Sequence, residues 1–178
     1  MRIIGGAWRR RIIRFPAAAD LRPTPDRVRE TLFNWLGQDL AELRCLDLYA
    51  GSGALSLEAL SRGAGLAVAV DRNRTLIASL QDAGRMLGAQ GLETRCAEAR
   101  SYLATERRSF DVIFLDPPFA EDPWPWLLAA CAERLAPGGY LYAEAARTLA
   151  PPPPLLPWRM EKAGLVHYHL FRREEPGA

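Results

Sequence analysis

The stretch LDLYAGSGA at residues 46–54 decides the fold of this chain. Its apolar residues predict a buried strand, its two glycines predict a tight turn, and the residues from Ala54 onward predict a helix. A strand that runs through a glycine turn into a helix is the first half of a βαβ unit. The stretch therefore predicts an α/β fold that is built on parallel strands.

The rest of the chain continues this alternation of short apolar runs and helical patterns. Strands are predicted near residues 43–48, 66–71, 92–96, 110–115 and 138–144, and helices near 25–38, 54–63, 74–89, 98–105 and 124–136. Thr24 is predicted as the N-cap of the first helix and Pro25 as its first residue. Such alternation predicts a doubly wound, mostly parallel, Rossmann-like sheet.

Both ends of the chain depart from the alternation. Residues 158–162 and 165–172 predict two strands with no helix between them, which indicates an antiparallel C-terminal pair and a total of seven strands. Short strands at residues 2–5 and 10–15 predict a small N-terminal hairpin. We expect one domain over residues 1–178, with a basic N-terminal extension at 1–24 and a catalytic core at 25–178.

Composition excludes several classes of protein. The 178 residues are 49% hydrophobic and 25% charged, as in ordinary globular domains. No apolar run is long enough to span a membrane. The three cysteines lie far apart and there are only two histidines, so neither a metal site nor a disulfide framework is expected. A cytoplasmic location fits this pattern.

Positive charge gathers at the N-terminus. The first 30 residues hold eight arginines and three acidic residues, for a net charge of +5, and the remaining 148 residues carry −3. Arginines clustered near Trp8 and Phe15 are typical of a surface that binds a phosphate backbone. The alternative is a solvated arm in an arginine-rich chain, because 22 of the 23 basic residues are arginine.

The glycine turn and the following strand ends predict a cofactor site, because ligands of open α/β sheets bind at the carboxyl ends of strands. Asp71 ends the second strand, where a carboxylate can accept hydrogen bonds from ribose hydroxyls; its alternative is an acid at a helix start. A dehydrogenase is disfavoured because Ser56 replaces the third glycine of the dinucleotide fingerprint. Glu98 could bind an adenine amino group, or could instead cap a helix. The candidate cofactor-binding residues are Asp47, Tyr49, Ala50, Gly51, Ser52, Gly53, Asp71, Arg72, Glu98 and Ala99.

The second motif is Asp116-Pro117-Pro118-Phe119, which follows the apolar run at 112–115. An aromatic amine is a poor nucleophile because its lone pair is delocalised into the ring. Hydrogen bonds to the Asp116 carboxylate and the Pro117 carbonyl would draw the nitrogen toward tetrahedral geometry, while Phe119 would stack on the base. The alternative is a tight turn that only ends a strand. With the glycine turn, the motif predicts a methyltransferase that uses S-adenosylmethionine to methylate an exocyclic base nitrogen.

Five segments resemble one known family over nearly the whole chain. They are RIIGG at 2–6, RPTPDRVRETLFNWL at 22–36, DLYAGSGA at 47–54, LEALSRGA at 57–64 and DPPF at 116–119. The chain is similar to the bacterial 16S ribosomal RNA guanine-N2 methyltransferases, which act on guanosine 966 of the small-subunit RNA. The segment at 22–36 is the most specific to this family, since many methyltransferases share the glycine and Asp-Pro-Pro motifs.

The resemblance implies a class I methyltransferase fold and S-adenosylmethionine as the methyl donor. It implies 16S ribosomal RNA as the partner, in the small subunit or its assembly intermediate, and we expect a monomer. The residues that would grip RNA are Arg9, Arg10, Arg11, Arg22 and Arg27. We also expect Arg27 to face the active site and to contact RNA or the cofactor carboxylate. Glu98 stands where the family often has Asp or Asn, and Asn73 where it often has a second acid, so the adenine contacts are the least constrained.

Two other functions remain open from the sequence. The Asp-Pro-Pro-Phe motif would also suit a methyltransferase acting on adenine N6 or cytosine N4. Asp116 is an acceptor only, which fits the adjacent N1–H and N2–H₂ donors of guanine better than the adenine edge. A catalytically silent RNA-binding or assembly factor on the same fold is the alternative from another class.

Overall fold

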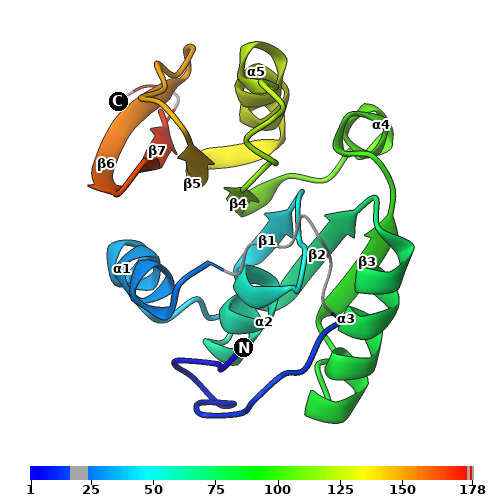
Figure 1. The fold of residues 1–178 in the computed structure, drawn as a ribbon. Helices are drawn as coiled ribbons and strands as arrows, with labels where there is room; N and C mark the ends of the chain where they lie inside the picture. Colours follow the sequence, from blue (N-terminus) through cyan, green and yellow to red (C-terminus); the bar gives the residue numbers. More distant parts are fainter. Residues whose placement is uncertain (17–23, 176, 178) are drawn as a thin grey trace.

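A computed structural model describes residues 1–16, 24–175 and 177, and a single seven-stranded sheet dominates them (Figure 1). The strands are β1 (Arg44–Asp47), β2 (Leu66–Asp71), β3 (Leu92–Cys96), β4 (Phe110–Leu115), β5 (Leu135–Ala145), β6 (Leu155–Ala163) and β7 (Val166–Arg173). The helices are α1 (Asp26–Leu36), α2 (Ala54–Ser61), α3 (Arg74–Leu87), α4 (Ala99–Thr105) and α5 (Trp124–Arg134).

The strand order is β3-β2-β1-β4-β5-β7-β6. The first five strands in the chain pair in parallel, whereas β7 runs antiparallel to both β5 and β6. This confirms the predicted Rossmann-like sheet with an antiparallel C-terminal pair. The order reverses between β1 and β4, so their carboxyl ends meet at the crevice where such sheets bind ligands.

Helices cover both faces of the sheet because both faces of its parallel strands are apolar. On one face, β-strand residues such as Leu46 and Ile113 pack with α4 and α5 in a large core cluster. On the other face, their neighbours Cys45 and Phe114 pack with α1 and α2. The alternation along each strand therefore fixes which helix lies on which side (Figure 1).

Several boundaries differ from the sequence prediction. Helix α1 begins at Asp26 with Pro25 at its N-cap, so the predicted N-cap role of Thr24 is wrong. The Thr24 hydroxyl instead donates a hydrogen bond to Glu144. Strand β5 begins at Leu135 rather than 138, because Leu135 pairs with Phe110 across an irregularity in the ladder.

The N-terminal segment forms a looser hairpin than predicted. A single isolated bridge joins Arg2 and Ile12, in place of two strands. Ile3 and Ile13 are buried beside α2 and α3. The chain passes so close to α2 that a Cβ on Gly6 would lie 1.7 Å from the carbonyl oxygen of Ser61. The hairpin is thus anchored to α2 by close backbone contact.

Within the described residues, no helix is long and apolar enough to cross a membrane. The same part of the chain holds no cluster of three or more histidine, cysteine or acidic side chains that could bind a metal ion.

Candidate active site

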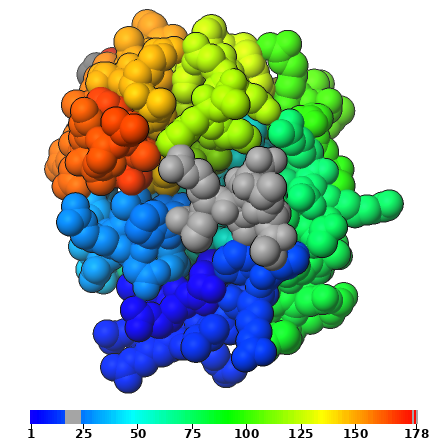
Figure 2. Space-filling view, viewed as in Figure 1, coloured from blue at the N-terminus to red at the C-terminus, as the bar shows by residue number. Residues whose placement is uncertain are grey.

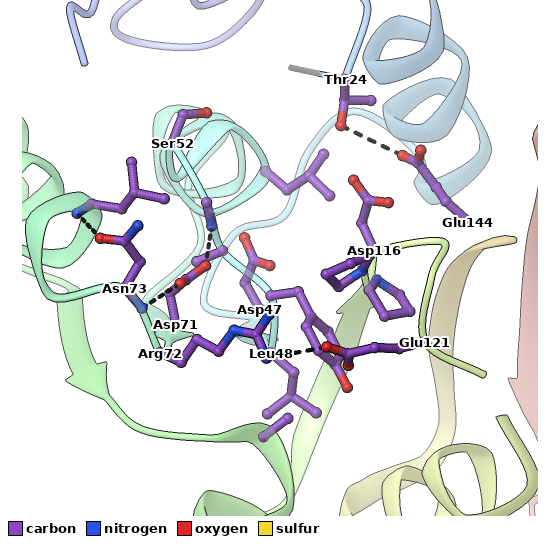
Figure 3. Close-up of a pocket in the computed structure, with 18 of the residues that line it drawn as sticks. Thr24, Asp47, Leu48, Ser52, Asp71, Arg72, Asn73, Asp116, Glu121 and Glu144 are labelled. Carbon is purple, nitrogen blue, oxygen red and sulfur yellow. Dashed lines mark hydrogen bonds and ion pairs between the residues drawn. The ribbon is translucent and has the colours of Figure 1, made fainter. Parts of the chain in front are cut away.

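A cavity of about 420 Å³ opens at the carboxyl ends of β1, β2, β4 and β5 (Figure 3). Its volume lies in the range of small-molecule sites. The structure brings the three predicted acids Asp47, Asp71 and Asp116 together around it, although they come from three different strand ends. This is the crevice that the reversal of strand order predicts.

The glycine turn and Asp71 form one rigid unit. The Asp71 carboxylate accepts hydrogen bonds from the backbone N–H of Gly51 at 2.8 Å and of Asn73 at 2.8 Å. Gly53 has φ of +75°, and a Cβ there would lie 2.3 Å from the side chain of Leu80. A glycine is therefore required at this position both for its backbone conformation and for space. A carboxylate has about four acceptor positions, so Asp71 can still accept ribose hydroxyls.

Asp47 is a buried carboxyl at the floor of the cavity. It is 3% exposed, and the hydroxyl of Ser56 donates to it at 2.8 Å. Its pKa is raised from 3.8 to about 7: burial is the main cause, the charges of Asp116 and Asp71 add to it, and the Ser56 hydrogen bond opposes them. Ser56, which the sequence marked only as a missing glycine, therefore holds this acid in place.

The far wall of the cavity comes from α4 and the segment before α5. Arg72 and Glu121, which both line the cavity, form an exposed ion pair at 3.1 Å (Figure 3). The Arg100 guanidinium lies 4.5 Å from the ring centroid of Trp126. Both contacts join residues far apart in the sequence, so local sequence signals could not reveal them.

Glu98 and Ala99 line the same wall at the start of α4. Glu98 occupies the N-cap position but makes no side-chain cap hydrogen bond, so its alternative as a helix cap is wrong in this structure. The backbone N–H of Ala99 belongs to the first helical turn, which has no acceptor within the helix. Both groups remain candidates for binding an adenine ring.

Asp116 to Phe119 carry the chain from the end of β4 along the cavity. Pro117 is buried, whereas Asp116 is half-buried and Phe119 is 39% exposed. The prolines fix the direction of the backbone. The motif therefore offers an acceptor group inside the cavity and an aromatic ring near its mouth, as the base-binding prediction requires.

Sequence reasoning missed three residues on this side of the cavity: Thr24, Glu144 and Tyr168. Glu144 is 6% exposed and lies at the end of β5. Its Oε1 accepts hydrogen bonds from the Tyr142 hydroxyl at 2.9 Å and the Thr24 hydroxyl at 3.5 Å. A buried acid near the end of a predicted strand was the signal that could have found it.

The candidate RNA-binding arginines lie outside the cavity. Arg9, Arg10 and Arg11 are exposed on the N-terminal segment, which forms one end of the face in Figure 2. Arg22 lies outside the described residues. Arg27 is exposed and lines a small separate pocket with Trp35 and Glu161, so the expectation that it faces the active site is wrong in this structure. The turn of α1 instead buries its neighbours Val28 and Arg29.

The side chains of the cavity fit a cationic adenosine-type ligand better than a nucleotide. Among the described residues that line it, six are acidic and two are arginine. Such a surface disfavours a polyphosphate and favours a ligand with a positive charge. S-adenosylmethionine carries a sulfonium charge, ribose hydroxyls and an adenine ring, and these groups match Asp47, Asp71 and the start of α4.

Comparison with known proteins agrees with this geometry. Residues 1–172 match the sequence model of the family described as Conserved hypothetical protein 95. Ribosomal RNA small subunit methyltransferase D of Escherichia coli K12 is 38% identical, covering 99% of this chain and 92% of its own length. The protein of the same name from Haemophilus influenzae is 34% identical, covering 97% of this chain and 93% of its own.

A solved structure shows the same arrangement in three dimensions. The putative methyltransferase YhhF from Escherichia coli superposes with a TM-score of 0.90 at 38% sequence identity. The match covers 98% of each chain, so it includes the N-terminal segment and the antiparallel C-terminal pair.

Proposed function

Because this chain belongs to the Conserved hypothetical protein 95 family, with the small-subunit ribosomal RNA methyltransferase D proteins, we propose the following reaction. The protein transfers the methyl group of S-adenosylmethionine to the exocyclic N2 of one guanine, position 966, in 16S ribosomal RNA. It is a class I methyltransferase.

One observation carries the proposal: the Asp116–Phe119 motif shares a single cavity with Asp71 and the glycine turn. A ribose bound at Asp71 places the adenosyl end of the donor over β1 and β2. The methyl-bearing end then lies toward β4, where the Asp116 carboxylate can accept a hydrogen bond from an amino group. Donor and acceptor sites thus meet at the strand-order reversal.

The residues of the chain position the reaction rather than take part in covalent chemistry. The Asp116 carboxylate and the Pro117 carbonyl accept hydrogen bonds from the two N2–H groups. These hydrogen bonds turn the nitrogen lone pair toward the methyl carbon. The new N–C bond forms as the S–C bond breaks, and the electron pair of the broken S–C bond stays on sulfur. The amine then loses one proton to water. Positioning and electrostatics supply the rate enhancement, so no strong base is needed.

The substrate is proposed to be the RNA within the small ribosomal subunit or its assembly intermediate, which places the reaction in the cytoplasm. In this proposal residues 25–178 form the catalytic core and the basic segment 1–24 extends the surface that holds RNA. Arg9, Arg10 and Arg11 are exposed and available to phosphates. The enzyme acts as a monomer.

The decisive experiment is transfer of a radiolabelled methyl group from S-adenosylmethionine to small subunits that lack the modification. Nucleoside analysis of the product should give N2-methylguanosine at one position. Detection of methyladenosine or N4-methylcytidine would show that the target base is adenine or cytosine and would refute the guanine assignment. Cofactor binding without any labelled RNA would favour the silent assembly factor.

Two variants test the division of roles within the cavity. Asp116→Ala should abolish methyl transfer and leave the dissociation constant of the cofactor unchanged. Asp71→Ala should weaken cofactor binding, by about 1–3 kcal/mol when ribose hydroxyls lose their partner. Equal effects of both variants on cofactor affinity would contradict this division.

A further inference from the structure

A second carboxylate, Glu144, lies beside Asp116 at the cavity. Strands β4 and β5 pair in parallel, with Leu115 next to Ala143. Asp116 and Glu144 each follow by one residue, so they stand at the same level on neighbouring strands. The ends of two adjacent strands therefore offer two carboxylates side by side, a relation that only the register of the sheet reveals.

The two carboxylates also lie on one face of the sheet. Phe114 and Tyr142, two residues before Asp116 and Glu144, pack in the same core cluster on the α1 side. Because side chains alternate along a strand, residues two apart share a face. Figure 3 agrees, since the labelled Asp116 and Glu144 both point toward the part of the cavity next to Thr24.

The surroundings fix Glu144 as an acceptor. The Tyr142 and Thr24 hydroxyls both reach its Oε1, which holds the carboxylate against the wall of the cavity. Tyr168 pairs directly with Glu144 across β5 and β7 and lines the cavity beside it. An ionised carboxylate accepts hydrogen bonds and donates none, so a ligand at this place must bring a donor.

We propose that Glu144 selects guanine by accepting its N1–H, while Asp116 and the Pro117 carbonyl hold the N2 amino group. The inference rests on the function proposed above and names the residue that reads the base. Guanine presents N1–H and N2–H₂ as neighbouring donors, which matches two neighbouring acceptors. Adenine and cytosine carry a ring nitrogen lone pair beside their amino group, and that lone pair would face the Glu144 carboxylate. The pair therefore rejects both bases.

A structural role alone is the competing explanation, because Glu144 also satisfies the buried Tyr142 hydroxyl. Glu144→Gln separates the two roles. Its amide oxygen can still accept from Tyr142, while its NH₂ group replaces an acceptor by a donor. Tyr142→Phe does the converse, since it removes the hydroxyl and keeps the carboxylate.

The test uses small subunits reconstituted with 16S RNA that carries either guanosine or 2-aminopurine riboside at the target position. Both bases have the N2 amino group, but N1 is a donor in guanine and an acceptor in 2-aminopurine. The wild-type enzyme should methylate guanosine faster by roughly tenfold to a hundredfold, the effect of one hydrogen bond to a charged group. Glu144→Gln should lower the guanosine rate and abolish or reverse this preference.

Two controls define the outcomes. Tyr142→Phe should keep the wild-type preference, and Glu133→Gln, an exposed change on α5, should alter nothing. The inference is overturned by an unchanged preference in Glu144→Gln, or by the same loss of preference in Tyr142→Phe. Weaker cofactor binding in Glu144→Gln with an unchanged base preference would show that Glu144 binds the cofactor and not the base, and would also overturn the inference. Failure of the wild-type enzyme to methylate guanosine would instead refute the proposed function.

Discussion

The buried position of Asp47 lowers the stability of the folded protein at neutral pH, and it also suits the binding of a cationic ligand. Burial holds its pKa at about 7, whereas its ordinary value is 3.8. Between these values the folded protein binds more protons than the unfolded chain, so the stabilising effect of protonated Asp47 is present below pH 4 and is lost as pH rises to 7. A cationic ligand would favour the ionised form, which explains an acid at this place.

Asp47→Asn should therefore raise the free energy of unfolding at pH 8, on the order of 2–4 kcal/mol, and change it little at pH 4. Asparagine can still accept from Ser56, so the hydrogen bond at 2.8 Å is kept. Urea denaturation at the two pH values checks this. The affinity for S-adenosylmethionine should fall at pH 8. A stability difference that is the same at both pH values would show that the charge is not its cause.

The sequence predicted Asp47, Asp71 and Asp116 because each one ends an apolar run. It did not predict Glu144, whose importance depends on lying level with Asp116 on the next strand. Nor did it place Arg27, because helical spacing gives relative directions and not the side on which the helix packs. Local patterns thus identify single strand ends, while pairing between strands decides which of them cooperate.

At the scale of elements, α2 is the anchor of the N-terminal segment. Glu58 is fully buried and accepts hydrogen bonds from the backbone N–H of Ile4 at 2.9 Å and Gly5 at 2.8 Å. It also forms ion pairs with Arg29 at 3.3 Å and Arg62 at 2.9 Å. One side chain therefore joins α1, α2 and the hairpin.

Glu58→Gln should destabilise the protein by about 3 kcal/mol, because the buried Arg62 loses its carboxylate partner and the buried Arg29 keeps only Asp26. Amide exchange at Ile4 and Gly5 should become faster than in the wild type. Hydrogen exchange followed by NMR measures this directly. Glu30→Gln, an exposed change of the same kind on α1, should have no such effect. Unchanged exchange at both amides would refute the anchoring role.

The turn after α4 contains a second ionic cluster. Arg108 donates to Glu106 at 2.8 Å, and Tyr102 also donates to this carboxylate. The Arg108 hydrogen bond is the main cause that lowers the Glu106 pKa from 4.5 to about 2, assisted by Tyr102 and the backbone N–H groups of Arg107 and Arg108. A lowered pKa stabilises the fold above pH 4.5, and that contribution disappears as pH falls toward 2.

Glu106→Gln should therefore lower the free energy of unfolding at pH 7 by about 1–2 kcal/mol, a figure reduced for the partial exposure of Arg108. At pH 2 the variant and the wild type should be nearly equal. Thermal unfolding across this pH range tests the prediction. Glu133→Gln provides the control, and an equal loss for Glu106→Gln at pH 2 and pH 7 would exclude the ionic explanation.

Element boundaries followed the sequence where a glycine or a charged turn marks them, as at the start of α2. They failed where tertiary pairing extends an element, as in β5, which begins at Leu135 through its contact with Phe110. The hairpin at the N-terminus is held by α2 more than by its own pairing, so a local strand pattern overestimated its regularity.

At the scale of the whole molecule, charge is divided between two regions. Acidic side chains line the cavity, whereas the N-terminal segment, which lies at one end of the face in Figure 2, carries exposed arginines. The net charge of +2 hides this division. The sequence predicted it because the arginines are contiguous, but the gathering of acids depends on the fold.

This division predicts how RNA binding responds to salt. Each phosphate contact contributes a slope of about 0.7–0.9 in the dependence of log affinity on log salt concentration. Replacing Arg9, Arg10 and Arg11 together with glutamine should therefore reduce the slope by about 2–3. The measurement is the affinity for small subunits across a salt series, with cofactor affinity expected to stay constant.

The matched control replaces three exposed arginines outside the N-terminal segment: Arg85, Arg95 and Arg107. Both triple variants remove the same net charge, so a general electrostatic effect would change both slopes equally. A local phosphate contact changes only the first. An equal reduction in the two variants would show that Arg9, Arg10 and Arg11 contribute only to the overall charge of the protein and make no local contacts with RNA phosphates.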